Sequence, residues 1–229
     1  MSCFQSVLRA AAIRTPPWFR RMLRAAWMWF HMRGKNVNTA QYWDTIYASN
    51  GDRPRHTCRD YQPVHDAIVP LVPEGSRVLD VGCGDGRLCQ ALASKGCQVV
   101  GLDFSGRAID ICRSKGIHAR RCVLPSIPAE IGTFDVVICS SVLAHLEKPD
   151  KTVAAMADHV SDDGLVIITV PAPAAIDRNL EHLHLFDRKD LLRLLGAVAC
   201  AGQCVLVAGN PDNGQCDHWI AWGKAFHAA

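Results

Sequence analysis

The fold is decided by the stretch Val78-Leu79-Asp80-Val81-Gly82-Cys83-Gly84-Asp85-Gly86, in which an apolar run ends in a glycine-rich turn. A helical pattern begins at Arg87, and a second apolar run, Gln98–Leu102, is followed by Asp103. Ligands of open α/β sheets bind at the carboxyl ends of the strands, so this turn is a candidate binding loop. Its glycines let the backbone approach a ligand closely and adopt positive φ. Asp103 then stands where a carboxylate can accept hydrogen bonds from both hydroxyls of a ribose.

The rest of the chain extends this unit, because apolar runs alternate with helical patterns. Buried strands separated by helices predict a parallel sheet covered on both faces, the doubly wound α/β class. The predicted strands are Arg77–Val81, Gln98–Leu102, His118–Val123, Phe134–Cys139, Leu165–Val170, Cys204–Ala208 and His218–Lys224. The predicted helices are 40–48, 62–71, Arg87–Lys95, Gly106–Lys115, Lys148–Val160 and Arg188–Leu195, with another near 17–32 and a linker at 51–55.

The glycine spacing separates two classes of nucleotide site. The dinucleotide fingerprint of oxidoreductases requires glycine at position 87, where this chain has Arg87. Asp80 and Asp85 flank the turn, and two carboxylates repel a pyrophosphate. A ligand with an ammonium and a sulfonium group is favoured by the same charges. The turn therefore disfavours a nucleotide-dependent oxidoreductase.

The stretch 80–86 and the later stretch Phe134–Leu146 resemble the class I S-adenosylmethionine-dependent methyltransferases, over about residues 40–224. The resemblance implies a Rossmann-like, doubly wound sheet of seven strands, mostly parallel with an antiparallel last strand. A hairpin across Gly209–Gly214 is expected from the sequence and agrees with that topology. The implied cofactor is S-adenosyl-L-methionine.

The resemblance also implies roles for single residues. Asp80 and the backbone of the turn would hold the methionine moiety, and Asp103 the ribose. Phe104 would pack on the adenine, and Ser140 would contribute backbone near the sulfonium. The implied cofactor-binding set is Asp80, Gly82, Cys83, Gly84, Asp103, Phe104, Cys122, Val123 and Ser140.

One departure from the family concerns the adenine. Many relatives have an acid after the third strand, whereas Arg121-Cys122-Val123-Leu124-Pro125 contains none. Adenine recognition would then depend on backbone and apolar contacts at Cys122 and Val123.

Candidate general bases follow the fourth and fifth strands. His145 and His182 are the predicted catalytic residues, with Glu181 and His184 beside the second of them. Histidine suits this role because its ordinary pKa lies near neutrality. A packing role for each histidine stays open.

The acceptor of the methyl group is predicted to be a small or lipid-like molecule. The fourth strand ends in Cys139-Ser140-Ser141-Val142 and lacks the Asn/Asp-Pro-Pro-aromatic tetrad of methyltransferases that act on nucleobases. Cys139 is interpreted as a buried packing thiol rather than a nucleophile. Oxygen, nitrogen, sulfur and carbon acceptors all stay open. A catalytically silent cofactor-binding or partner-binding protein on the same fold is the alternative.

An aromatic helix precedes the core at Gln41-Tyr42-Trp43-Asp44-Thr45-Ile46-Tyr47. It resembles the helix that covers the cofactor in many small-molecule methyltransferases. Core packing of Trp43 and Tyr47 is the competing interpretation. Both place the helix near the carboxyl edge of the sheet.

Charge and cysteine content narrow the class of protein further. Residues 1–43 carry seven basic and no acidic side chains, which leaves 18 basic against 22 acidic in the remainder. A mildly acidic body disfavours nucleic acid as a partner. The 11 cysteines are scattered without a CxxC pair, which predicts reduced thiols in a cytoplasmic protein and no metal site.

The basic N-terminal arm, residues 1–39, is distinguished from the domain at 40–229, and we expect it to lie on a membrane surface or to close over a hydrophobic acceptor. After Pro16-Pro17, a helix would place Phe19, Met22, Leu23, Ala26, Trp27 and Phe30 on one face and arginines on the other. This composition is typical of an interfacial helix, which would make the protein peripheral at a membrane. Docking on the domain and a cleavable organellar presequence stay open. No transmembrane helix is expected.

Overall fold

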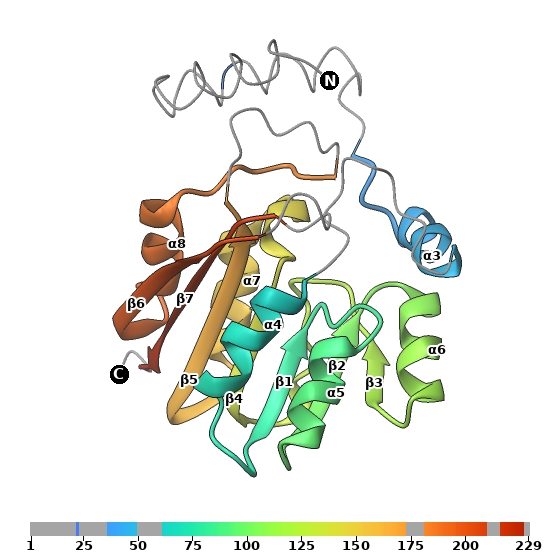
Figure 1. The fold of residues 1–229 in the computed structure, drawn as a ribbon, viewed down its shortest axis with the longest axis horizontal. Helices are drawn as coiled ribbons and strands as arrows, with labels where there is room; N and C mark the ends of the chain where they lie inside the picture. The colour runs from blue at the N-terminus through green and yellow to red at the C-terminus, as the bar shows by residue number, and fades with distance from the viewer. Residues whose placement is uncertain (1–21, 23–35, 50–60, 173–180, 210–215, 227–229) are drawn as a thin grey trace.

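The computed structural model describes Met22 and residues 36–49, 61–172, 181–209 and 216–226 (Figure 1). The predicted helix near 17–32, apart from Met22, and the predicted linker at 51–55 lie outside the described residues. The division into an arm and a domain therefore stays a prediction.

Seven strands form one sheet in the order β3-β2-β1-β4-β5-β7-β6. All neighbouring pairs are parallel except those of β7, which is antiparallel to both β5 and β6. This confirms the seven-stranded topology and the antiparallel last strand. The strands are β1 Arg77–Val81, β2 Gln98–Asp103, β3 His118–Arg121, β4 Phe134–Ser140, β5 Val160–Pro171, β6 Ala199–Val207 and β7 His218–Ala225.

Helices cover both faces of the sheet, with α4 and α5 in front of the strands in Figure 1 and α7 and α8 behind them. α6 packs on β2 and β3, and α3 contacts α6. The α-helices are α3 Ala40–Ala48, α4 Gln62–Ile68, α5 Arg87–Ser94, α6 Gly106–Ser114, α7 Pro149–Ala157 and α8 Arg188–Leu195. Short 3-10 helices are η1 Val69–Leu71, η2 Ala129–Ile131 and η3 Leu143–His145.

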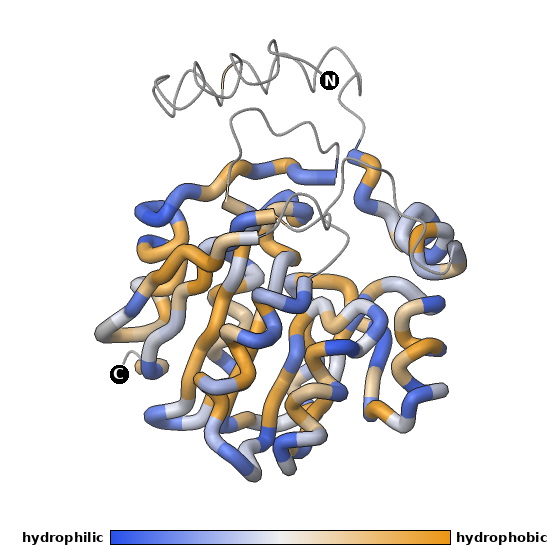
Figure 2. The backbone as a smooth tube through the Cα atoms, viewed as in Figure 1, coloured by the Kyte–Doolittle hydropathy of each residue, from blue (hydrophilic) through white to orange (hydrophobic). Residues whose placement is uncertain are grey.

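The two-residue period of the strands explains why both faces are covered. In β1, Val78 packs with α4 and α5, while Leu79 belongs to the cluster that contains residues of α7 and α8. In β4, Val136 lies in the same cluster as Val78, and Val137 lies in the same cluster as Leu79. Figure 2 shows apolar residues along the central strands. Each strand is thus apolar on both sides, as a sheet between two helix layers requires.

Several boundaries differ from the sequence-based prediction, and three of them concern where a strand begins or ends by two residues or more. β3 ends at Arg121, and the next amide, Cys122 N, donates to the Asp103 carbonyl at 2.9 Å. β5 begins at Val160, which the helical pattern had included in the preceding helix. β6 begins at Ala199, five residues before the predicted start. The sequence did not indicate this first part of the strand, because it contains glycine and polar residues, lies on the edge of the sheet and includes a register shift. Edge strands carry a weaker apolar signal than central ones.

The described cysteines are free thiols, as predicted. Cys139 is fully buried, and burial raises the pKa of its thiol, which supports packing over nucleophilic attack. Within the described ranges, none of the helices combines the length and the apolar character that a membrane span requires.

Candidate functional site

A cavity of about 920 Å³ opens where β1, β2 and β4 end. Its wall is formed by the glycine turn, the segments that follow β2, β3 and β4, and residues of α3 and α4. Ten of the eleven predicted site residues line it: Asp80, Gly82, Cys83, Gly84, Asp103, Phe104, Cys122, Val123, Ser140 and His145.

The glycine turn is held against the end of β2. The amides of Gly82 and Cys83 both donate to the Leu102 carbonyl, at 2.7 and 2.9 Å. Gly84 has a φ of 54°, and a Cβ there would lie 2.7 Å from the Tyr47 hydroxyl oxygen. A larger residue at Gly84 would therefore strain the backbone and displace the Tyr47 hydroxyl. The glycine keeps this wall of the cavity open to a ligand.

Asp80 supplies a buried carboxyl group to the cavity wall. Its side chain is 1% exposed, and burial raises its pKa to about 7, with the nearby charge of Asp103 acting in the same direction. The Cys89 thiol donates to Oδ2 at 3.2 Å. Among the described residues, Oδ1 has no hydrogen-bond partner. A buried acid with an unsatisfied oxygen is suited to a cationic ligand group.

Asp103 presents a second carboxyl group at the end of β2. The Gly84 amide donates to Oδ2 at 3.0 Å, and the Ser105 amide donates to Oδ1 at 2.9 Å. Burial raises its pKa, while these amides act to lower it. Each carboxylate oxygen can accept a further hydrogen bond, so the oriented group still has capacity for two ligand hydroxyls.

The rim of the cavity beyond Asp103 is mostly apolar. Arg121 Nε donates to the Phe104 carbonyl at 3.0 Å, which ties the end of β3 to the segment after β2. Cys122 is buried, whereas Val123 is 64% exposed. A flat ring could lie between Phe104 and Val123 without an acidic partner.

The end of β4 lines the cavity and is joined to β5 by hydrogen bonds. Ser140 Oγ lies 3.2 Å from Thr169 Oγ1 on β5, and the Ser141 amide donates to the Thr169 carbonyl at 3.1 Å. Ser141 has a φ of 59°, an uncommon value for a residue with a side chain. This turn directs the chain along the cavity and into η3.

His145 lies at the end of η3 and lines the cavity. Its Nδ1 donates to the Glu181 carbonyl at 3.0 Å. The Trp43 ring lies edge-on at 5.2 Å between centroids, and the His182 ring lies at 4.9 Å. A neutral imidazole that donates through Nδ1 has an acceptor at Nε2, which is the form needed in a general base.

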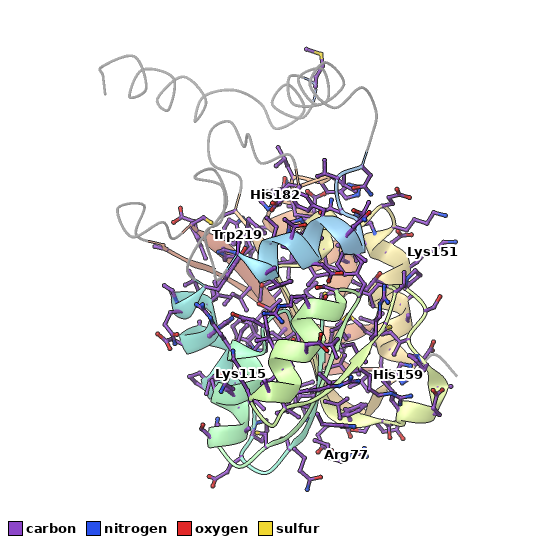
Figure 3. All side chains as sticks on the ribbon, turned by 90° about the vertical axis from the view of Figure 1, so that its right-hand side faces the viewer. Arg77, Lys115, Lys151, His159, His182 and Trp219 are labelled. Atoms are coloured by element: carbon purple, nitrogen blue, oxygen red, sulfur yellow. The ribbon has the colours of Figure 1, made fainter. Side chains whose placement is uncertain are left out.

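His182 does not line the cavity, in contrast to His145. It is buried and packs against the His145 ring, at the same end of the molecule as α3 and opposite Arg77 in Figure 3. Glu181 and His184 also lie outside the lining. The amides of Leu183 and His184 both donate to the Ala144 carbonyl, at 2.6 and 3.2 Å, so this segment supports η3 from behind.

Several polar residues of the cavity were not predicted from the sequence. Asn38 precedes α3, while Tyr61, Gln62 and His65 belong to α4 or the residue before it. They lie in segments without a recognisable motif, so no local signal could have identified them. Trp43 and Tyr47 of the aromatic helix also line the cavity, which confirms its place at the carboxyl edge.

The cavity is lined by two chemically distinct sets of side chains. Asp80 and Asp103 can hold a ligand that carries a cation and two hydroxyls. His145 can accept a proton from a second molecule, among the aromatic rings of Trp43, Tyr47 and Tyr61. Such a cavity fits a charged methyl donor beside an uncharged acceptor.

A family model described as "Methyltransferase domain" matches residues 52–201, more than half of the chain. The ubiquinone biosynthesis O-methyltransferase of Bordetella avium (strain 197N) is 33% identical over 127 residues, which cover 48% of this chain and 52% of that protein. The chain thus spans about half the length of the curated relatives it matches.

Solved structures share the fold. The N-methyltransferase NodS from Bradyrhizobium japonicum WM9, in complex with S-adenosyl-L-homocysteine, aligns with a TM-score of 0.64 at 18% identity, over 84% of this chain and all of that one. The [4+2]-cyclase SpnF also reaches 0.64, at 16% identity, over 82% of this chain and 96% of that one. Likeness at this level concerns the fold, which alone does not fix a reaction.

Proposed function

Because the chain belongs to the family of methyltransferase domains, we propose that it transfers a methyl group from S-adenosylmethionine to a hydroxyl of a small molecule. The observation that carries this proposal is that one cavity is lined by Asp80, Asp103 and His145. We use "cofactor half" for Asp80, the turn 82–84 and Asp103, and "acceptor half" for Trp43, His145 and the segment 181–184 behind it.

The residues of the cofactor half fit S-adenosylmethionine. The unsatisfied Asp80 Oδ1 provides a counter-ion for the amino group of its methionine moiety. Asp103, oriented by two amides, accepts from the ribose hydroxyls, and Phe104, Cys122 and Val123 border the adenine. The bound cofactor supplies a methyl group already activated on sulfur. The protein therefore contributes mainly position and a base.

His145 acts as the base toward the acceptor. Its Nε2 takes the proton of the acceptor hydroxyl while the oxygen forms a bond to the methyl carbon and the carbon–sulfur bond breaks. The products are the methyl ether, S-adenosylhomocysteine and a proton held by the imidazolium. The Nδ1 hydrogen bond to the Glu181 carbonyl then stabilises the charged ring.

We propose that the acceptor is an aromatic hydroxyl compound, such as a quinone precursor. Trp43, Tyr47 and Tyr61 provide aromatic faces in the cavity, and Asn38 and Gln62 provide uncharged hydrogen-bonding groups. The relatives named for ubiquinone biosynthesis support the same class. A phenol needs deprotonation near neutral pH, which gives His145 its role.

Binding and turnover test this proposal together. S-adenosylhomocysteine at about 100 times its dissociation constant should stabilise the protein by about 2.7 kcal/mol in a thermal-shift assay, whereas dinucleotides should have no effect. Isotopically labelled S-adenosylmethionine is then supplied with catechols and polyprenyl phenols, and the products are analysed by mass spectrometry. Labelled methyl ethers support the proposal. Binding without transfer to any acceptor class supports the silent alternative.

We also propose that the basic arm brings a cytoplasmic enzyme to a membrane surface that holds a lipid-like acceptor. Its tryptophans, phenylalanines and arginines, and its lack of acids, support this. Full-length protein should sediment with anionic vesicles at low salt, less at high salt, and not at all after deletion of residues 1–36. Protein that stays in the supernatant at low salt would rule out membrane binding by the arm.

A further inference from the structure

α3 touches both halves of the cavity. At the middle of the helix, Asp44 Oδ1 accepts from Ser105 Oγ at 2.5 Å and from the Arg107 amide at 3.0 Å, at the start of α6. Ser105 is the residue whose amide orients Asp103. One turn later, the Tyr47 hydroxyl lies against the glycine turn. The second half of α3 is therefore placed by the same segments that form the cofactor half.

The first part of α3 contacts the support of His145. The Tyr42 hydroxyl donates to Glu181 Oε1 at 2.6 Å. Asn38 Nδ2 donates at 2.7 Å to the Glu181 carbonyl, which is also the acceptor for His145 Nδ1. The Trp43 ring packs edge-on against the His145 ring. The proposed base is thus held between α3 and Glu181.

Burial makes the Tyr42–Glu181 contact costly to lose. Glu181 is 4% exposed, so its carboxyl group depends on protein partners rather than on water. The segment 181–184 is fixed to η3 through the Ala144 carbonyl, and η3 carries His145. Glu181 and His145 therefore belong to one supported unit, to which α3 is joined by side chains.

We propose that Tyr42 and Glu181 are positioning residues, which make the orientation of His145 depend on the docking of α3 and so on the cofactor. This inference rests on the proposed function, since it requires a ligand in the cofactor half. A ligand there orders the second half of α3, from Asp44 to Tyr47. Because α3 is a single nine-residue helix, its first turn moves with its last. Filling the cofactor half thereby fixes the imidazole that serves the acceptor half.

Nitrogen-15 spectroscopy of histidine tests the coupling without turnover. S-adenosylhomocysteine is titrated into labelled full-length protein, and the His145 ring signals are identified by their loss in His145→Gln. In the wild type these signals should shift and sharpen toward the form protonated on Nδ1. In Tyr42→Phe the response should be largely lost. Thr45→Val is the matched control, because it removes one exposed hydroxyl from the same helix.

Kinetics supply a second readout once an acceptor is available. Tyr42→Phe should lower kcat about tenfold and leave KM for S-adenosylmethionine within about threefold. Glu181→Gln should retain most of kcat, because its amide oxygen can still accept from Tyr42, whereas Glu181→Ala should not. Circular dichroism and thermal melts verify that each variant is folded. Equal losses in Thr45→Val and Tyr42→Phe would overturn the positioning role.

The outcomes separate this inference from the proposed function. If calorimetry shows that S-adenosylhomocysteine binds while the His145 signals stay unchanged, the coupling is wrong and the proposed function stands. If Tyr42→Phe responds as the wild type does, Tyr42 has no positioning role. If S-adenosylhomocysteine does not bind at all, both the function and the inference fail.

Discussion

The cofactor half stands on the ends of two central strands, whereas the acceptor half is assembled from short helices and one connecting segment. In the first, the amides of Gly84 and Ser105, 19 and 2 residues away in sequence, orient Asp103. In the second, a hydrogen bond joins Tyr42 to Glu181, 139 residues apart in sequence. Central strands open rarely, while short helices joined by side chains open more readily.

This difference assigns different tasks to the two halves. A rigid, pre-formed cofactor half loses little conformational entropy when it binds its ligand. In an acceptor half built from α3, η3 and residues 181–184, we expect the helix α3 to move more readily than the supported unit of Glu181 and His145 when an acceptor enters. Substitutions should therefore reduce cofactor affinity in the first half and turnover in the second.

The largest effect is expected in the cofactor half. Asp103→Ala removes two charge-assisted hydrogen bonds to the ribose and should weaken S-adenosylhomocysteine binding by about 2–4 kcal/mol. Calorimetry measures the dissociation constant, and Asp110→Ala, an exposed acid on α6, is the control. An unchanged constant in a folded Asp103 variant would exclude the ribose assignment.

His145→Ala should separate the two halves most clearly. Loss of the base should lower kcat about 100-fold and leave the affinity for S-adenosylhomocysteine nearly intact. His182→Ala should have a smaller effect, because that ring supports His145 from outside the cavity. Full turnover of both variants between pH 6 and 9 would mean that the reaction needs no base.

The raised pKa of Asp80 predicts that the affinity for the cofactor depends on pH. Burial raises its pKa to about 7, so below that pH the empty site holds a neutral carboxyl group. A bound ammonium favours the carboxylate, so binding releases a proton and should tighten about tenfold between pH 6 and 7.5. Asp80→Asn should bind more weakly and show a flat profile by calorimetry. A steep profile in the variant would assign the proton to another group.

The raised pKa of Asp80 also predicts that this residue lowers the stability of the unliganded protein at high pH. A carboxyl group whose folded pKa is raised stabilises the fold fully below its ordinary pKa, and this contribution is lost as the pH rises through 7. Unliganded Asp80→Asn should therefore melt higher than the wild type at pH 8 and approach it at pH 5. Equal melting temperatures at pH 8 would mean that Asp80 is not held neutral by burial.

The two halves also differ in how far the sequence predicted them. Asp80, the glycine turn and Asp103 were identified because strand, turn and helix signals are local and adjacent. His145 was identified by its place after a strand, but the placement of His182 behind it was not. That arrangement depends on how the segment 181–184 meets η3, a tertiary contact that leaves no local pattern. Asn38, Tyr61 and His65 were missed for the same reason.

The predicted ends of two strands were wrong, because backbone hydrogen bonding and not hydropathy determines where these strands begin and end. The apolar residues Cys122 and Val123 were predicted to continue β3, yet the strand ends at Arg121 and these two residues border the cavity. The predicted β6 was too short, because Gly202 and Gln203 interrupt the apolar run of this edge strand. Apolar periodicity thus located the core elements better than the loops that shape the site.

The smallest expected effect concerns the contact between α3 and α6. Asp44→Ala removes the hydrogen bonds from Ser105 Oγ and the Arg107 amide, which together should contribute about 1 kcal/mol to docking of the half-exposed helix. Amide exchange in α3 should accelerate about fivefold, which corresponds to that free energy, while β1 and β4 stay protected. The Ser105 hydroxyl, followed by the Arg107 amide, lowers the pKa of Asp44, so its contribution persists at neutral pH and is lost only as the pH falls below the usual range of aspartate. S-adenosylhomocysteine should restore slow exchange in the variant, because the ligand orders the same part of the helix. Acceleration that extends into β1 would mean that α3 stabilises the whole fold and not the cavity alone.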